Sequence, residues 1–335
     1  MRAEPQERER AALPTTEVAV PALKAVSIGR RSRFITWLMR RLMRPYLSWL
    51  LRGSNERIAR AQLLCASQVC RDSSGFAVDY DVIGAPDAGV PGHVVGRLTE
   101  REKTVVLWIH GGAFLLPAAP DIHVRLVARI CRELDAVGFL PDYRLAPFNR
   151  FPAALDDCER AYQALLDLGF APQRIVLAGE SAGGNLVLGL LQRIRRRGWP
   201  MPACAVPISP VTEMGRVHAP PSRTLRMNSD PLLPIAGLQR VDELYAGSHD
   251  AHDPELSPLY ADCRGFPPLY LLASDTEVLL DDSVLFARRA RAAGVDLQLD
   301  VWPVLPHAFP LFGGLYPEVR QARDDIIAFA RRHLG

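Results

Sequence analysis

Short apolar runs alternate along this chain with longer amphipathic stretches. Eight apolar runs predict β-strands, and they occupy residues 76–83, 94–98, 104–109, 136–140, 174–178, 203–209, 268–273 and 296–301. Helical periodicity is found between several of these runs, over residues 122–134, 152–168 and 283–293. Apolar strands that alternate with helices are typical of a mostly parallel sheet with helices on both faces. We therefore predict an α/β fold with an eight-stranded sheet and an active site at the carboxyl ends of the strands.

A serine stands where one predicted strand turns directly into a helix. The motif Gly-Glu-Ser-Ala-Gly at residues 179–183 follows the strand over residues 174–178, and a helical run begins close behind it. A tight strand-to-helix turn exposes the serine hydroxyl and points the next backbone N–H at an incoming carbonyl group. The motif alone occurs by chance in many chains, but in this context it predicts Ser181 as a nucleophile that a nearby base activates.

A second segment of small residues, His-Gly-Gly-Ala-Phe, follows the strand over residues 104–109. Acyl transfer needs two or three N–H donors that stabilise the oxyanion, each worth about 2.7–4 kcal/mol. Small residues allow backbone N–H groups to face a ligand. We predict that Gly111, Gly112 and Ala113, together with Ala182 of the serine motif, form an oxyanion hole. The plainer interpretation is a glycine turn that only reverses the chain.

The base should be a histidine late in the chain, because triads of this type run in the order nucleophile, acid, histidine. His307 follows the predicted strand over residues 296–301 and lies between prolines, which exclude a regular helix or strand at that point. Two other histidines, His249 and His252, lie beside aspartates. No matching set of ligands accompanies them, so we expect no metal site.

The acid should follow a core strand between the serine and the histidine. The strand over residues 268–273 is followed by four acidic residues, of which Asp275 and Glu277 are nearest to the strand end. Spacing alone does not choose between these two. Asp281 and Asp282 are expected in the first turn of the next helix, where negative charge is favourable.

Taken together, these motifs resemble the hormone-sensitive-lipase family of α/β-hydrolases, in particular its bacterial esterases. The resemblance covers residues 75–335 and includes two further motifs within residues 142–157, Asp-Tyr-Arg-Leu-Ala-Pro and Phe-Pro-Ala-Ala-Leu-Asp-Asp. It implies the α/β-hydrolase fold with a helical cap, and hydrolysis of short- to medium-chain acyl esters through an acyl-enzyme intermediate without a cofactor. The family pattern Asp-Pro-Leu-x-Asp falls on residues 277–281, so the resemblance favours Glu277 as the acid and leaves Asp275 as the alternative.

Three positions depart from the family pattern. Ala113 replaces the third glycine of the oxyanion motif, and a positive φ there would strain the backbone. Phe148 stands where the family usually has glutamate, in a loop that we interpret as structural. Glu180 stands where the family often has aspartate, and we expect its side chain to point away from the reacting carbonyl.

The resemblance also suggests how the chain is divided. We expect residues 1–20 to be disordered, residues 21–72 to form an N-terminal helical cap, and residues 73–335 to form the catalytic domain. A proline-rich insertion over residues 213–253, with a helical patch at residues 235–245, is expected to complete the cap.

The N-terminal segment has an unusual charge pattern, because residues 24–60 contain ten Lys or Arg and one acid. Its arginines exclude a conventional membrane span. We favour a cap in which Trp37, Leu38, Leu42 and Trp49 pack against the core and the substrate. The alternative is a basic amphipathic helix that lies on an anionic membrane surface.

The overall composition is that of an ordinary globular protein, with 335 residues, 48% hydrophobic and 23% charged. The net charge of +3 is concentrated at one end, since residues 1–60 hold 13 basic and 5 acidic residues. We therefore expect no nucleic-acid partner. The first residues lack the pattern of a signal peptide, so a cytoplasmic location is expected.

Other functions share many of these features. A non-catalytic ligand receptor can have the same fold, but this chain retains a serine, an acid and a histidine in the required order. An amidase or deacetylase would use the same triad on a different leaving group, and a membrane-attached lipase would use the same chemistry at a surface. The expected partner is a small-molecule ester. Peripheral membrane contact through the N-terminal basic helix and a homodimer are two further options.

Overall fold

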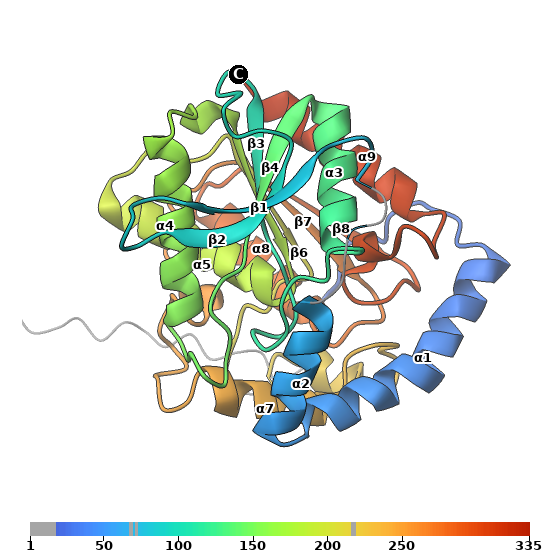
Figure 1. Cartoon of the computed structure of the whole chain (residues 1–335). Coiled ribbons are helices and arrows are strands. Elements are labelled where there is room, and N and C mark those ends of the chain that lie inside the picture. Colours follow the sequence, from blue (N-terminus) through green and yellow to red (C-terminus); the bar gives the residue numbers. More distant parts are fainter. Residues whose placement is uncertain (1–17, 67–69, 71–72, 216–218) are drawn as a thin grey trace, which may run out of the picture.

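The computed structural model describes residues 18–66, 70, 73–215 and 219–335, and one eight-stranded sheet runs through its centre (Figure 1). The strand order is β1-β2-β4-β3-β5-β6-β7-β8. Strand β2 pairs antiparallel with both β1 and β4, whereas every other neighbouring pair is parallel. The strands are Val78–Ile83 (β1), Val90–Val95 (β2), Thr104–Ile109 (β3), Ala136–Pro141 (β4), Ile175–Glu180 (β5), Cys204–Ile208 (β6), Leu269–Ser274 (β7) and Leu297–Trp302 (β8).

Helices cover both faces of this sheet, as Figure 1 shows. One face carries α4 (Ala153–Asp167), α5 (Ala182–Arg197) and α8 (Leu280–Ala292), and the other carries α3 (His123–Leu134) and α9 (Val319–His333). The remaining described elements are α1 (Arg30–Leu51), α2 (Asn55–Ala66), α6 (Ser222–Leu225), α7 (Ile235–Tyr245) and the short 3-10 helices η1 (Pro172–Arg174), η2 (Pro258–Tyr260) and η3 (Phe309–Phe312).

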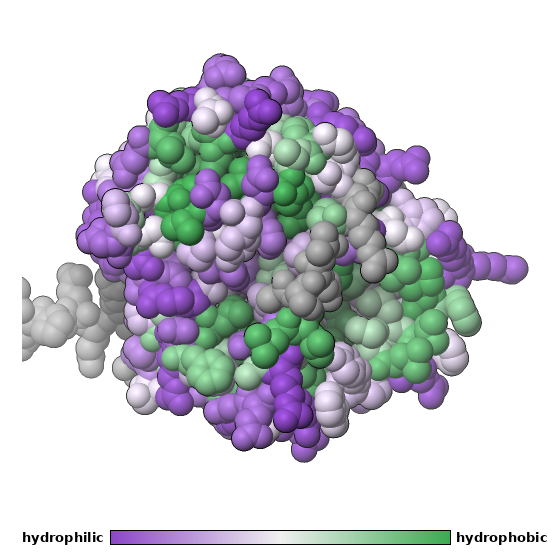
Figure 2. All heavy atoms as spheres, in the orientation of Figure 1, coloured by the Kyte–Doolittle hydropathy of each residue, from purple (hydrophilic) through white to green (hydrophobic). Residues whose placement is uncertain are grey.

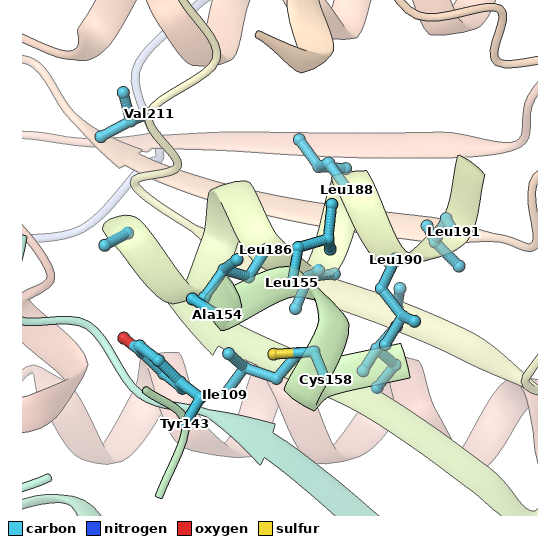
Figure 3. Packing of buried hydrophobic residues seen from close by; sticks show 14 of the residues in the cluster. Ile109, Tyr143, Ala154, Leu155, Cys158, Leu186, Leu188, Leu190, Leu191 and Val211 are labelled. Carbon is cyan, nitrogen blue, oxygen red and sulfur yellow. The ribbon is translucent and has the colours of Figure 1, made fainter. Parts of the chain in front are cut away.

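Strand β3 explains why the central strands are apolar along their whole length. Leu107 and Ile109 point into the hydrophobic cluster beneath α4 and α5, whereas Val106 and Trp108 point into the cluster beneath α3 and α9. Side chains alternate between the faces of a strand, so a strand covered on both sides needs apolar residues at every position. Figure 3 shows side chains of α4, including Leu155, packed against those of α5 close to Ile109.

The predicted fold class is confirmed, and seven of the eight strands lie within about two residues of their expected positions. The second strand begins four residues earlier than expected, at Val90. The sequence pattern missed it because Pro91 and Gly92 are both poor strand formers. Gly92 is required there, since a Cβ at this position would lie 2.4 Å from the carbonyl oxygen of Leu140 on the neighbouring strand.

The N-terminal segment reaches the edge of the sheet at β8. Leu23 forms a parallel bridge with Val301, and the Lys24 N–H donates to the Val301 carbonyl at 2.8 Å. Val18 is buried and packs in the same hydrophobic cluster as Val301. Disorder was expected for residues 1–20, and residues 1–17 of this range lie outside the described part. Val20 packs in the same cluster as Val18, whereas Ala19 is exposed.

The two segments that were expected to form the cap contact each other. Helix α1 contacts α7 of the second insertion, and Leu51 of α1 packs against Gly237 of α7. The base of α1 is fixed to the catalytic domain by Ser32, whose hydroxyl donates to the Glu318 carboxylate at 2.7 and 2.9 Å, and by Thr36, which hydrogen-bonds to the Tyr316 hydroxyl at 3.1 Å. None of the described helices combines the length and apolar character that a membrane span requires.

The expected packing of four cap side chains is wrong. Trp37, Leu38, Leu42 and Trp49 are 51%, 37%, 60% and 54% exposed, so they do not pack against the core. Helix α1 instead turns a different side towards the protein. Met39 lies on that side and is 6% exposed. The reason is the anchoring of its first turns, since the contacts of Ser32 and Thr36 determine which face of the helix points inward.

The second insertion is held on the catalytic domain by a buried ion cluster. Arg223 of α6 is 2% exposed and donates to the Asp282 carboxylate of α8 at 2.7 and 3.1 Å, and its guanidinium lies 3.6 Å from the Glu213 carboxylate. Asp282 also accepts the Thr212 N–H at 2.8 Å. A charge that loses its partner in such a site keeps its desolvation cost.

We expect Arg223→Met to lower the free energy of unfolding by about 3–5 kcal/mol, because the buried Asp282 carboxylate loses the guanidinium that donates two hydrogen bonds to it. Chemical unfolding followed by circular dichroism measures this. The control is Arg240→Met, which removes the partly exposed pair with Glu243 at 2.9 Å and should cost less than about 1 kcal/mol. Equal losses for the two variants would contradict a stabilising role for the buried cluster.

Candidate active site

Ser181 lies at the turn between β5 and α5 in a backbone conformation that few residues adopt. Its φ is 56° and its ψ is −118°, and its N–H donates to the Ile208 carbonyl at 2.8 Å. The neighbouring glycines are sterically required. A Cβ on Gly183 would lie 1.9 Å from the Ile109 carbonyl oxygen, and one on Gly179 would lie 2.5 Å from the same oxygen. The strand, turn and helix expected around this serine are thus present, and backbone contact with β3 makes the turn tight.

The imidazole of His307 is held by Glu277. Nδ1 of His307 lies 2.7 Å from one carboxylate oxygen of Glu277, and both side chains are buried. The other oxygen of Glu277 accepts the Ser274 N–H at 2.8 Å and the Ser209 hydroxyl at 3.1 Å. Because a carboxylate accepts hydrogen bonds, it favours the tautomer with the proton on Nδ1 and leaves the lone pair on Nε2.

Asp275, the alternative acid, has a different contact. Its carboxylate accepts the Val304 N–H at 2.7 Å, and burial raises the pKa of this carboxyl group above its usual value. It therefore supports the loop that leads to His307 and does not touch the imidazole. Asp281 and Asp282 occupy the first turn of α8, as the sequence predicted.

The third link, between Ser181 and His307, is not a hydrogen bond in this structure. Nε2 of His307 is buried and has no hydrogen-bond partner among the described residues. The segment after β6 connects the two residues. Val211 N–H donates to the Ser181 carbonyl at 3.3 Å, and the Ser209 hydroxyl accepts the Ala308 N–H at 3.3 Å. Catalytic hydrogen bonds are often long without substrate and shorten in the complex, so this geometry is compatible with a Ser–His pair.

The oxyanion loop needs one correction. Gly111 was expected to contribute its N–H to the oxyanion, but this N–H donates to the carboxylate of Glu180. Gly112, Ala113 and Ala182 therefore remain as candidate donors. Ala113 has the positive φ that would strain an alanine, 58°, and the next residue, Phe114, has the same value.

Contacts from both parts of the cap hold this strained loop. Gln62 of α2 donates its side-chain amide to the Leu115 carbonyl at 2.7 Å and to the Ala146 carbonyl at 3.1 Å. From the second insertion, Tyr245 of α7 stacks on Phe114 with ring centroids 3.8 Å apart. Helices α2 and α7 therefore hold the predicted oxyanion loop through backbone carbonyls and an aromatic stack.

Glu180 has a larger role than the sequence suggested. Its carboxylate is 1% exposed and accepts the Trp108 indole N–H at 2.8 Å in addition to the Gly111 N–H, and it lies 3.0 Å from Nε2 of His123. It therefore ties the oxyanion loop to the serine turn. The signal that could have indicated this role was an acidic residue at the end of a buried strand, between Gly179 and Ser181, because a buried carboxylate requires hydrogen-bond donors.

The other motifs of the resemblance are structural. Tyr143 donates its hydroxyl to the His110 carbonyl at 2.7 Å and stacks on the His110 ring at 4.2 Å. Burial lowers the pKa of His110 to about 3, so this imidazole is neutral at pH 7. Arg144 pairs with Asp157 at 3.0 Å, and Phe148 is 68% exposed on the surface of this loop. Within the described residues, no group of three or more His, Cys, Asp or Glu side chains is arranged to hold a metal ion.

A model of the α/β-hydrolase fold matches residues 106–311 of this chain. Among curated proteins, an acetyl-hydrolase from Streptomyces hygroscopicus is 34% identical over 258 residues, which are 76% of this chain and 85% of that protein. The esterase LipU from Mycobacterium tuberculosis is 36% identical over 239 residues, which are 70% of this chain and 79% of that protein.

Solved structures agree over nearly the whole chain. A crystal structure of an esterase from the bacterial hormone-sensitive lipase family has a TM-score of 0.79 and 31% identity, and the match covers 92% of this chain and 100% of that one. An esterase/lipase from an uncultured bacterium has a TM-score of 0.79 and 31% identity, with 91% of this chain and 99% of that one covered. Residues 106–311, which the α/β-hydrolase model matches, include Ser181, Glu277 and His307.

The backbone contact at the serine turn gives a direct test. We expect Gly183→Ala to lower the free energy of unfolding by at least about 3 kcal/mol, because the new Cβ meets two backbone carbonyls that cannot move independently of the sheet. The matched control is Gly314→Ala, where nothing lies within 4 Å and the change should stay within about 0.5 kcal/mol. Thermal unfolding of both variants measures the difference, and a stable Gly183→Ala protein would contradict the tight turn.

Proposed function

The chain belongs to the hormone-sensitive-lipase-like family of α/β-hydrolases and is a carboxylesterase-type serine hydrolase, and on this premise we propose that Ser181, Glu277 and His307 form its catalytic triad. The observation that carries the proposal is the hydrogen bond of 2.7 Å between the Glu277 carboxylate and Nδ1 of His307. It leaves Nε2 as a buried acceptor. Ser209, which follows β6, bonds both the Glu277 carboxylate and the N–H of Ala308, the residue after His307.

The mechanism follows from these positions. Ser181 Oγ attacks the ester carbonyl carbon while Nε2 of His307 takes the hydroxyl proton. The tetrahedral intermediate then loses the alcohol, which leaves with that proton, and an acyl-enzyme on Ser181 remains. Water attacks the acyl carbonyl, passes a proton to Nε2, and the carboxylic acid leaves as Ser181 regains its proton. Glu277 keeps the imidazole in the required tautomer and stabilises the imidazolium.

We assign the oxyanion hole to the N–H groups of Gly112, Ala113 and Ala182. The positive φ values at Gly112 and Ala113 support this assignment. In a turn of this kind, unlike an extended strand, successive backbone N–H groups can point at one anion. Preorganised donors stabilise the developing negative charge without reorganisation during the reaction.

The substrate class that we propose is short- to medium-chain acyl esters. Acetyl-hydrolases and esterases among the relatives support this class. A homodimer and a cytoplasmic location stay predictions. For a homodimer, the edge of β8 is already paired with Leu23, so a second copy would have to displace this segment or use another surface.

The proposal predicts hydrolysis of p-nitrophenyl esters, with the highest kcat/KM at acyl chains from acetate to octanoate and a decline towards palmitate. Ser181→Ala should reduce turnover to the background rate and abolish labelling by a fluorophosphonate, because the nucleophile is removed. Thermal unfolding of this variant should match the original chain. Turnover that persists in a correctly folded Ser181→Ala protein would overturn the assignment of the nucleophile.

The two acids can be separated by matched amide substitutions. Glu277→Gln should lower kcat on the order of 10³–10⁴-fold, because an amide no longer stabilises the imidazolium or enforces the tautomer. Asp275→Asn should lower kcat by less than about tenfold, since an asparagine oxygen can still accept the Val304 N–H. Steady-state kinetics on p-nitrophenyl butyrate decide, and the reverse order of effects would move the role to Asp275.

A further inference from the structure

Helix α1 exposes a continuous apolar face to solvent. Five large side chains that recur every three or four residues form this face, which we call the α1 stripe: Phe34, Leu38, Leu42, Tyr46 and Trp49. Their exposed fractions are 61%, 37%, 60%, 50% and 54%. In Figure 2, hydrophobic residues gather at the lower right, where Figure 1 places α1. Contiguous exposed apolar patches on otherwise polar surfaces mark interaction sites.

The three sides of α1 have distinct chemistry. Successive residues are about 100° apart around a helix, so Met39 and Leu50 share the side that is buried against the protein. The α1 stripe lies on one flank of that side, with Arg31 on the same flank at its N-terminal end. Arg33, Arg40 and Arg44 lie on the opposite flank, and Arg30 and Arg41 lie between them and the stripe. The helix therefore has one side that packs on the protein and an outer side that is partly apolar and partly basic.

The positive charge of α1 has no ion-pair partner among the described acidic side chains, although the Arg33 charge acts on Asp275 and opposes the burial that raises the pKa of that carboxyl group. The helix has six arginines and no acidic residue, and none of these arginines forms an ion pair with a described acidic side chain. Three of them contact aromatic or carbonyl groups instead. Arg41 lies over the Trp37 ring at 5.5 Å, Arg33 donates to the Ile28 carbonyl at 3.3 Å, and Arg44 donates to the Met227 carbonyl. A partner for this surface has to be apolar and negatively charged at once.

We propose that the α1 stripe and its arginines dock on the surface of an anionic lipid bilayer, with the helix axis parallel to the membrane plane. The acyl region takes up the leucines and phenylalanine, and lipid phosphates accept the arginine N–H groups. Tyr46 and Trp49 suit the boundary between these regions because each ring combines an apolar body with a polar group. A second copy of the chain fits less well, because two identical faces would bring twelve arginines together.

A second pair of exposed leucines lies on α2, the next helix in the chain. Leu63 and Leu64 of α2 are 73% and 71% exposed, and they directly follow Gln62, whose amide holds the oxyanion loop at the Leu115 carbonyl. Membrane contact would therefore occur at the part of the cap that lies over the oxyanion loop. Esters dissolved in the bilayer would then approach the site from the side of α2, a consequence that rests on the proposed function, whereas docking itself does not.

Vesicle flotation of the full chain tests the proposal. We expect binding to vesicles of phosphatidylcholine with about 30% phosphatidylglycerol, little binding to phosphatidylcholine alone, and release at high salt. Arg40→Gln with Arg41→Gln should weaken binding by about 25-fold, from about fivefold for each basic residue near an anionic surface. Phe34→Ser with Leu42→Ser should weaken it at least tenfold, because apolar burial is removed.

The matched control is Phe148→Ser with Leu315→Ser, which replaces two exposed apolar residues outside α1, 68% and 44% exposed, and should bind vesicles like the original chain. Unchanged melting temperature and unchanged hydrolysis of soluble p-nitrophenyl acetate establish that the α1 variants fold.

Failure to float with anionic vesicles, or equal binding by the stripe variant and the control, would overturn the proposal. A dimer in the absence of lipid would also overturn it, if only the stripe substitutions convert that dimer to a monomer. The α1 stripe would then bind a second copy of the chain. Flotation does not require hydrolysis, so an inactive but vesicle-binding protein would reject only the proposed function.

Discussion

The architecture of the site depends on the contact between the backbone of β3 and the first turn of α5. The Ile109 carbonyl lies where any side chain at position 183 would be, so the two segments approach as closely as backbone atoms allow. This contact places the loop after β3 beside the serine turn, and a Cβ built on Gly111 would lie 3.2 Å from the Cβ of Ser181. Glycine is used here because no other residue permits that approach.

Buried carboxylates then determine how the loops around Ser181 are arranged. Glu180 holds the oxyanion loop, and Glu277 holds the imidazole. Asp230 is also fully buried, and it accepts the N–H groups of Val278, Leu232 and Leu233 at 2.7–2.8 Å. A carboxylate in an apolar interior is tolerated only when donors surround it. Each acid therefore connects segments that are distant in the sequence, and the geometry of the site is the sum of these connections.

The cap illustrates how one helix can serve two surfaces. The inner side of α1 packs on α7 and on the region around Tyr316, and this packing orients the remaining sides outward. An apolar stripe on the outer side is not required for folding, since folding would favour its burial. Its retention beside six arginines is understandable if the surface has a partner with both acyl chains and negative charge.

Local patterns in the sequence determined the strands, the main helices and the strand-to-helix turn at Ser181, because periodicity and turn chemistry are properties of neighbouring residues. Spacing alone left Asp275 and Glu277 open; the resemblance favoured Glu277, and the tertiary structure brought its carboxylate to His307. The function of Glu180 and the outward direction of the α1 stripe were decided only by the tertiary structure. The physical reason is that hydrogen-bond partners and helix orientation depend on segments far away in the sequence, and these meet only when the sheet is formed.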